Sequence, residues 1–151
     1  MKKRLLLITI FFLIGAIIIY FITEPKVEKW IYNLPNNYVI KKESDTKIQL
    51  GKYIDNRIVF KKDNKQIGIE EYIAEFSYSQ NYVSLKCLES TDENIIVKFY
   101  IIDTKNENIY GPYLDEETYN KVKEKIVDEE LNKWIETIKM PKGATKKWGK
   151  W

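Results

Sequence analysis

The stretch IIVKFYIIDTKNENIYGPYLDEETY, residues 95–119, carries the strongest fold signals of this chain. In residues 95–103, odd-numbered and even-numbered positions alike are mostly Ile, Val, Phe or Tyr, so an extended strand would be apolar on both faces. A strand covered on both faces is typical of a position inside a sheet, with another element packed on the second side. The stretch therefore predicts a central strand with a cover.

The same stretch leads into the expected cover. Asp115 is a good helix N-cap, and acidic residues at 116 and 117 suit the first turn of a helix. Two apolar stripes follow, about 110° apart, so one straight helix would not bury both. We expect two short C-terminal helices with a break near Asp128. The stripes are Tyr119, Val122 and Ile126, then Leu131, Trp134, Ile135 and Ile138.

From Tyr38 onward the apolar period is two, and Asn, Asp and Ser recur between the periodic segments as turn signals. The pattern predicts an α+β domain, an antiparallel meander sheet of about six to seven strands with one or two C-terminal helices packed on it. The expected strands are 38–42, 47–53, 57–61, 72–78, 82–88, 95–103 and 108–113.

A long apolar run lies near the start of the chain. Residues 5–22 contain no charged side chain and reach roughly 27 Å as a helix, close to the roughly 30 Å of a bilayer core. The small pair Gly15-Ala16 is followed by more apolar residues, which disfavours a cleaved signal peptide. The sequence predicts a transmembrane helix used as a signal-anchor, with a buried core helix as the other alternative. Lys2, Lys3 and Arg4 precede it and indicate a cytoplasmic N-terminus.

These signals divide the chain into four parts. We expect a transmembrane signal-anchor helix over 1–23 and a juxtamembrane helix or linker over 24–36. An extracytoplasmic α+β domain follows over 37–138, and a flexible basic, Trp-containing tail over 139–151. The predicted location is the cell membrane, single-pass, with the domain outside.

Composition excludes several classes of function. The chain has no histidine, which removes Ser-His-Asp catalysis and most zinc sites, and its six glycines form no phosphate-binding loop. The net charge of +3 arises from the three basic residues before the apolar run, so the rest is neutral and does not favour nucleic acid. We predict no enzyme activity, no cofactor and no metal.

Three groups of residues are candidate contact sites. Tyr110, Gly111, Pro112 and Tyr113 form either a partner surface or simply a bend between a strand and a helix. Trp30 is either an interfacial membrane anchor or a packing residue. The tail is either solvated or in contact with anionic lipid or a wall polymer; its candidate residues are Lys146, Lys147, Trp148, Lys150 and Trp151.

Cysteine and carboxylate chemistry leave further alternatives. Cys87 has no partner for a disulfide and is either a buried apolar residue, which alternation with Val83 and Leu85 favours, or a reactive thiol. Dense acidic pairs could serve glycoside hydrolysis or calcium binding, but they fall at predicted turns and helix starts. The pairs begin at Glu70, Asp92, Asp115 and Asp128.

Three segments carry a resemblance to a known family. They are WIYNLPNNYVI (30–40), YIAEFSYSQNYVSLK (72–86) and FYIIDTKNENIYGPYLDEETY (99–119). The chain resembles a family of small uncharacterised exported, often lipoprotein-like, proteins of Gram-positive bacteria. They share a Trp-x-x-x-Leu-Pro opening and an Asp-Thr-Lys hairpin followed by Tyr-Gly-Pro. The resemblance implies an exported domain and no catalytic residue.

The sequence therefore favours a membrane-anchored extracytoplasmic binding or accessory domain with an unidentified protein partner. One alternative is an immunity-type protein that captures a toxin at the cell surface. A carboxylate-based cell-wall hydrolase is the alternative from another class of function.

Overall fold

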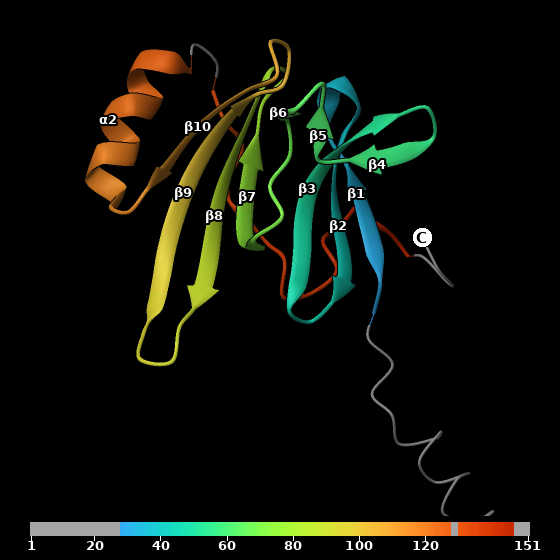
Figure 1. The fold of residues 1–151 in the computed structure, drawn as a ribbon, viewed down its shortest axis with the longest axis horizontal. Helices are drawn as coiled ribbons and strands as arrows, with labels where there is room; N and C mark the ends of the chain where they lie inside the picture. The colour runs from blue at the N-terminus through green and yellow to red at the C-terminus, as the bar shows by residue number, and fades with distance from the viewer. Residues whose placement is uncertain (1–27, 128–129, 147–151) are drawn as a thin grey trace, which may run out of the picture.

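The computed structural model describes residues 28–127 and 130–146, which form two antiparallel sheets, a small hairpin and a single α-helix (Figure 1). The first sheet has the strand order β12-β1-β2-β3-β4. Its strands are β1 (Trp30–Asn33), β2 (Tyr38–Ser44), β3 (Lys47–Ile54), β4 (Arg57–Val59) and β12 (Thr145–Lys146). A short 3-10 helix, η1 (Pro35–Asn37), connects β1 to β2.

The second sheet has the strand order β10-β9-β8-β7-β11. Its strands are β7 (Tyr72–Tyr78), β8 (Tyr82–Ser90), β9 (Ile95–Asp103), β10 (Asn108–Tyr113) and β11 (Ile135–Glu136). Between the sheets the chain forms the hairpin of β5 (Lys61–Lys62) and β6 (Lys65–Gln66). All seven strands expected from the period of two are confirmed, some with shifted ends.

The expectation of one meander sheet is wrong, because the chain changes sheets between β4 and β7. Gly68 lies so close to β3 that an added Cβ would be 2.5 Å from the Leu50 carbonyl oxygen, and Ile69 forms a β-bridge with Leu50. Glycine allows this close approach of the two backbones. The crossing segment is thus held against β3, and a second sheet begins at β7.

Both sheets share one hydrophobic core. Trp30, Ile40 and Leu50 from the first sheet and Phe76 and Leu85 from the second are all fully buried in one cluster. On the other face of the second sheet, Phe99 and Ile101 of β9 pack against the helix residue Tyr119. In Figure 1 the second sheet accordingly lies between α2 and the first sheet. The prediction that β9 is covered on both faces is confirmed.

Helix α2 (Glu116–Ile126) begins where the sequence predicts. The Asp115 carboxylate accepts a hydrogen bond from the Thr118 backbone N–H at 2.7 Å, and Glu116 and Glu117 occupy the first turn. The Tyr119 ring stacks on Phe99, with 5.0 Å between their centroids. This aromatic contact fixes the helix on β9.

The expected second helix is wrong. Ile135–Glu136 is strand β11, which pairs with Phe76 and Glu75 of β7. The open edge of β7 offers backbone hydrogen bonds to this segment, and such tertiary contacts override a helical spacing of apolar residues. Asp128, the predicted break, lies outside the described residues.

The predicted helix around residues 24–36 is also wrong over its described part. Residues 30–33 form β1, and the core contacts follow a period of two: Trp30 and Leu34 belong to the shared core cluster and Tyr32 packs against it. The described part of the tail is not free either, since β12 pairs Thr145 and Lys146 with β1. The C-terminal segment therefore adds one edge strand to each sheet.

The predicted fold class is corrected by these findings. The described chain is mostly antiparallel sheet with one short helix, so neither the α+β class nor its transmembrane helix is supported. Within residues 28–127 and 130–146, no helix has the length and apolar character to cross a membrane. The segment predicted to span the membrane, 1–23, lies outside the described residues, and the extracytoplasmic location stays a prediction.

The Thr137 side chain links the C-terminal segment to β7 by hydrogen bonds, and replacement of Thr137 by valine should destabilise the protein. Its buried hydroxyl shares its one proton between the carbonyl oxygens of Ile73 and Ala74, at 2.5 and 2.9 Å. Valine keeps the shape but leaves these buried acceptors with one bond fewer, so we expect a loss of about 1–3 kcal/mol in urea unfolding. Thr137→Ser keeps the hydroxyl and should lose less. A valine variant as stable as the parent would contradict this role.

Candidate functional site

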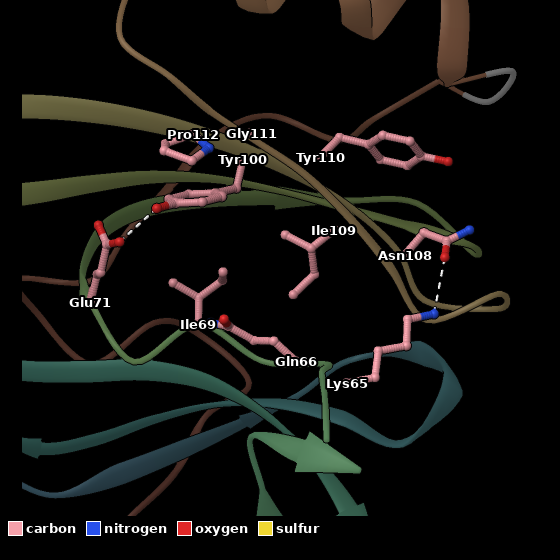
Figure 2. A pocket seen from close by; sticks show the side chains of 10 residues that line it. All are labelled: Lys65, Gln66, Ile69, Glu71, Tyr100, Asn108, Ile109, Tyr110, Gly111 and Pro112. Carbon is pink, nitrogen blue, oxygen red and sulfur yellow. Dashed lines mark hydrogen bonds between the residues drawn. The ribbon is translucent and has the colours of Figure 1, made fainter. Parts of the chain in front are cut away.

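A pocket of about 570 Å³ lies between β10 and the segment that runs from β6 toward β7 (Figure 2). Ile69, Ile109 and the Tyr100 ring form its apolar part, and polar side chains stand at both ends. Its lining residues are Lys65, Gln66, Ile69, Glu71, Tyr100, Asn108, Ile109, Tyr110, Gly111 and Pro112.

Strand β10 is an edge strand, bonded to β9 on one side only. Among the sheet edges of the described chain it is the longest, with six residues against three in β4 and two each in β11 and β12. Every second residue of an edge strand directs its backbone N–H and C=O away from its neighbour, where they remain able to pair with another chain. The pocket thus runs along a free backbone edge.

The bulge in β10 results from Gly111 and Pro112. Gly111 has a φ of +114°, and a Cβ at this position would lie 2.6 Å from the Phe99 carbonyl oxygen. Pro112 follows it through a cis peptide bond and has no N–H to pair. The shift in register between Tyr110 and Tyr113 lets both tyrosines pack on the side of α2. Backbone groups that could pair with another chain are therefore confined to the residues of β10 before Gly111.

The structure brings the predicted partner surface together only in part. Tyr110, Gly111 and Pro112 line the pocket, and Gly111 and Pro112 are exposed. Tyr113 is half-buried beside Tyr110, and both pack against the cluster of Phe99, Ile101 and Tyr119. Burial raises the pKa of the Tyr113 hydroxyl. Whether the four residues bind a partner stays a prediction.

Sequence reasoning missed the opposite wall of the pocket. Gln66 and Ile69 lie in a segment whose apolar residues follow no clear period. Glu71 belongs to an acidic pair whose sequence indicates a solvent-exposed turn. They meet β10 only because the chain changes sheets there. Tyr100 did have a signal, since it faces the core side of a strand predicted to be covered on both faces.

Glu71 and Tyr100 form a hydrogen-bonded pair at one end of the pocket. The Tyr100 hydroxyl donates to Glu71 Oε1 at 2.6 Å. Glu71 Oε2 is buried and lies 3.3 Å from Lys98 Nζ, an ion pair without the alignment of a hydrogen bond. Lys98 also pairs with Glu89 at 2.8 Å, and this bond raises the pKa of the Lys98 ammonium. The carboxylate of Glu71 is therefore held in place.

Tyr100→Phe should change how stability depends on alkaline pH. Burial, then the bond to Glu71, raise the pKa of Tyr100 above its ordinary value near 10. Above that pH the unfolded chain loses a proton that the folded chain keeps, so stability falls by up to about 1.4 kcal/mol per pH unit. Unfolding curves between pH 9 and about 12 should show a shallower decline for Tyr100→Phe. Equal slopes in both proteins would contradict the buried hydrogen bond.

Lys65 lines the opposite end of the pocket, and Lys52 and Lys62 lie beyond it around Glu107. Lys65 Nζ donates to Asn108 Oδ1 at 3.0 Å, a bond drawn in Figure 2. Lys52 Nζ lies 2.7 Å from Glu107 Oε1 and Lys62 Nζ lies 3.7 Å from Oε2. The hydrogen bond from Lys52 and the charges of Lys62 and Lys65 lower the pKa of Glu107. This end of the pocket is accordingly cationic.

The described lining of the pocket contains one carboxylate, that of Glu71. Glycoside hydrolysis uses two facing carboxyl groups, whereas the described lining contributes one, Glu71, which is already bonded to Tyr100. Among the described residues, no group of three or more Cys, Asp or Glu side chains is placed to hold a metal ion. A pocket with an apolar floor and polar ends is typical of a ligand site.

The remaining candidates lie away from this pocket. Trp30 is completely buried in the core, which favours packing over contact with a membrane surface. Lys146 forms an ion pair with Glu28 at 2.9 Å. Cys87 is buried, as the alternation predicts, and burial raises the pKa of its thiol. Lys147, Trp148, Lys150 and Trp151 lie outside the described residues.

Comparisons with known proteins do not place this chain in a family. No family model matches it. Neither a curated protein nor a solved structure matches it either. The resemblance to exported Gram-positive proteins therefore stays a prediction.

Proposed function

We propose that this chain is a binding protein that takes an extended peptide segment of a partner protein into the pocket along β10. The observation that carries the proposal is the position of a pocket of about 570 Å³ beside the longest free sheet edge of the described chain. The proposal refines the binding role expected from the sequence and involves no catalytic step.

An edge strand and a pocket contribute different parts of peptide recognition. Within Asn108–Tyr110, the backbone groups that point away from β9 supply main-chain hydrogen bonds to an added strand, each worth about 0.5–1.5 kcal/mol. The apolar floor of Ile69, Ile109 and Tyr100 receives alternate side chains of that strand. Pro112 ends the pairing, which limits the contact to a short segment.

The β10 edge is less protected against pairing with another chain than the other edges of the two sheets. The β4 edge carries Arg57, and the two-residue strands β11 and β12 offer too little backbone for a register. Short edges and charged edges are the usual protection against unwanted pairing. The edge of β10 has this protection only at its end, where Gly111 and Pro112 form the bulge.

A displayed library of short random peptides tests the proposal. Peptides enriched on the full chain should bind about tenfold more weakly, or not at all, to Gln66→Trp, because the indole fills the pocket. Gln80→Trp is the matched control, since Gln80 is exposed in the turn between β7 and β8. If nothing is enriched, or if both variants bind equally, the proposal is wrong.

A further inference from the structure

The two ends of the pocket carry opposite charge. Around Glu107, the residue before β10, stand Lys52, Lys62 and Lys65. The nearby carboxylate of Asp103 is buried and accepts hydrogen bonds from the Asn106 backbone and side chain, and Lys105 adjoins it in the same turn. Asp63 lies in the turn between Lys62 and Lys65 and adds a third anion to Glu107 and Asp103. The four lysines still outnumber these anions, so the Lys65 end attracts a negative group.

The opposite end has the reverse balance. Glu71 and Glu89 share the single ammonium of Lys98, at 3.3 and 2.8 Å. Glu70, exposed next to Glu71, adds another negative charge. This end therefore attracts a positive group or a hydrogen-bond donor.

The distance between the ends fits a short extended peptide. From Asn108 to Pro112 the strand takes four steps of at most about 3.4 Å, so the bulged strand spans no more than roughly 14 Å. An added strand of about five residues covers the same length. A free carboxyl end of such a segment supplies the negative group that the Lys65 end attracts, and its backbone N–H groups supply hydrogen-bond donors for the Glu71 end.

From this charge pattern, and resting on the proposed function, we infer that the pocket binds the free C-terminal segment of a partner, antiparallel to β10. The terminal carboxylate lies at Lys65 and the amino side of the segment lies toward Glu71. Antiparallel pairing is also the more stable of the two orientations per residue. Selectivity for a free carboxyl end is thus built into the ends of the pocket and is independent of the side chains on its floor.

A short peptide with a Thr/Val core and no charged side chains provides the probe. With a free carboxyl end it should bind the full chain about fivefold to tenfold more tightly at low salt than the same peptide as a carboxyl-terminal amide. Lys65→Glu should remove this preference. Lys125→Glu, the same charge change at an exposed position of α2, should keep it.

A nitroxide on the amino side or on the carboxyl side of the peptide reports the orientation. The carboxyl-side label should broaden the amide NMR signals of Lys65 and Asn108, and the amino-side label that of Glu71. The reverse pattern, or equal binding of acid and amide, overturns the inference while peptide binding itself stands. If neither the acid nor the amide binds and the peptide library also enriches nothing, the proposed function fails.

Discussion

Trp30→Ala should lower the free energy of unfolding by about 3–5 kcal/mol, the largest loss that we expect from a single substitution. Trp30 is 0% exposed, although it lies in the first described strand. Its side chain belongs to the core cluster that joins the two sheets. Alanine removes most of this contact area and leaves a cavity that both sheets border. Urea unfolding of the full chain, followed by circular dichroism, measures the loss.

Trp30→Phe is the control for this substitution. The indole Nε1 is buried without a hydrogen-bond partner, so phenylalanine removes a polar group that contributes no bond and keeps most of the apolar contact. It should cost less than half as much as alanine. A loss below about 1 kcal/mol for Trp30→Ala would show that Trp30 is not a core residue, as expected instead for a tryptophan at a membrane surface.

Gly111→Ala should have the second largest effect, about 2–3 kcal/mol, and it should also weaken peptide binding. Two costs combine at this position. The φ of +114° is unfavourable for alanine, and the new Cβ would lie 2.6 Å from the Phe99 carbonyl oxygen. Relief of this overlap has to move β10 away from β9, which changes the wall of the pocket. Thermal unfolding and the affinity for a library-selected peptide measure the two effects.

Gly143→Ala separates the two costs. Gly143 also has a positive φ, +94°, but the nearest atom to its Cβ position is Tyr32 Cε2, at an ordinary 3.6 Å. This variant should lose about 1 kcal/mol from backbone strain alone and bind peptide normally. Equal losses of stability and of affinity in both variants would show that the contact with Phe99 is unimportant.

Local patterns in the sequence were sufficient for the long elements. The period of two located the seven strands from β2 to β10 apart from the β5–β6 hairpin, and Asp115 located the start of α2. These signals succeed because alternation and capping depend on neighbouring residues only. The apolar residues on both faces of β9 also predicted that a helix covers it.

The short strands could not be predicted in the same way. β11 and β12 have two residues each, and their conformation depends on the edges of β7 and β1, which are far away in the sequence. The apolar residues in 30–34 fit a helical spacing and a period of two equally well. This segment is a strand because it pairs with the edge of β2. Division into two sheets depends on contacts such as Leu50 with Ile69, which no local pattern contains.

The candidate site shows the same limit. The Tyr-Gly-Pro stretch was recognisable because glycine and proline after a strand indicate a bend in the chain. Lys65, Gln66 and Glu71 form the other wall only after the chain has crossed between the sheets. A pocket with walls from two distant segments can be predicted from the sequence only when each segment has a recognisable local pattern.

Amide hydrogen exchange in β10 tests the central claim most directly, because strand addition has to place new hydrogen bonds on this edge. With a library-selected peptide at saturation, amides among Asn108, Ile109 and Tyr110 should exchange at least about tenfold more slowly. Amides of α2 that face solvent should keep their rates. Unchanged exchange throughout β10 in the saturated complex would show that the peptide binds elsewhere or without strand pairing, and would contradict the account.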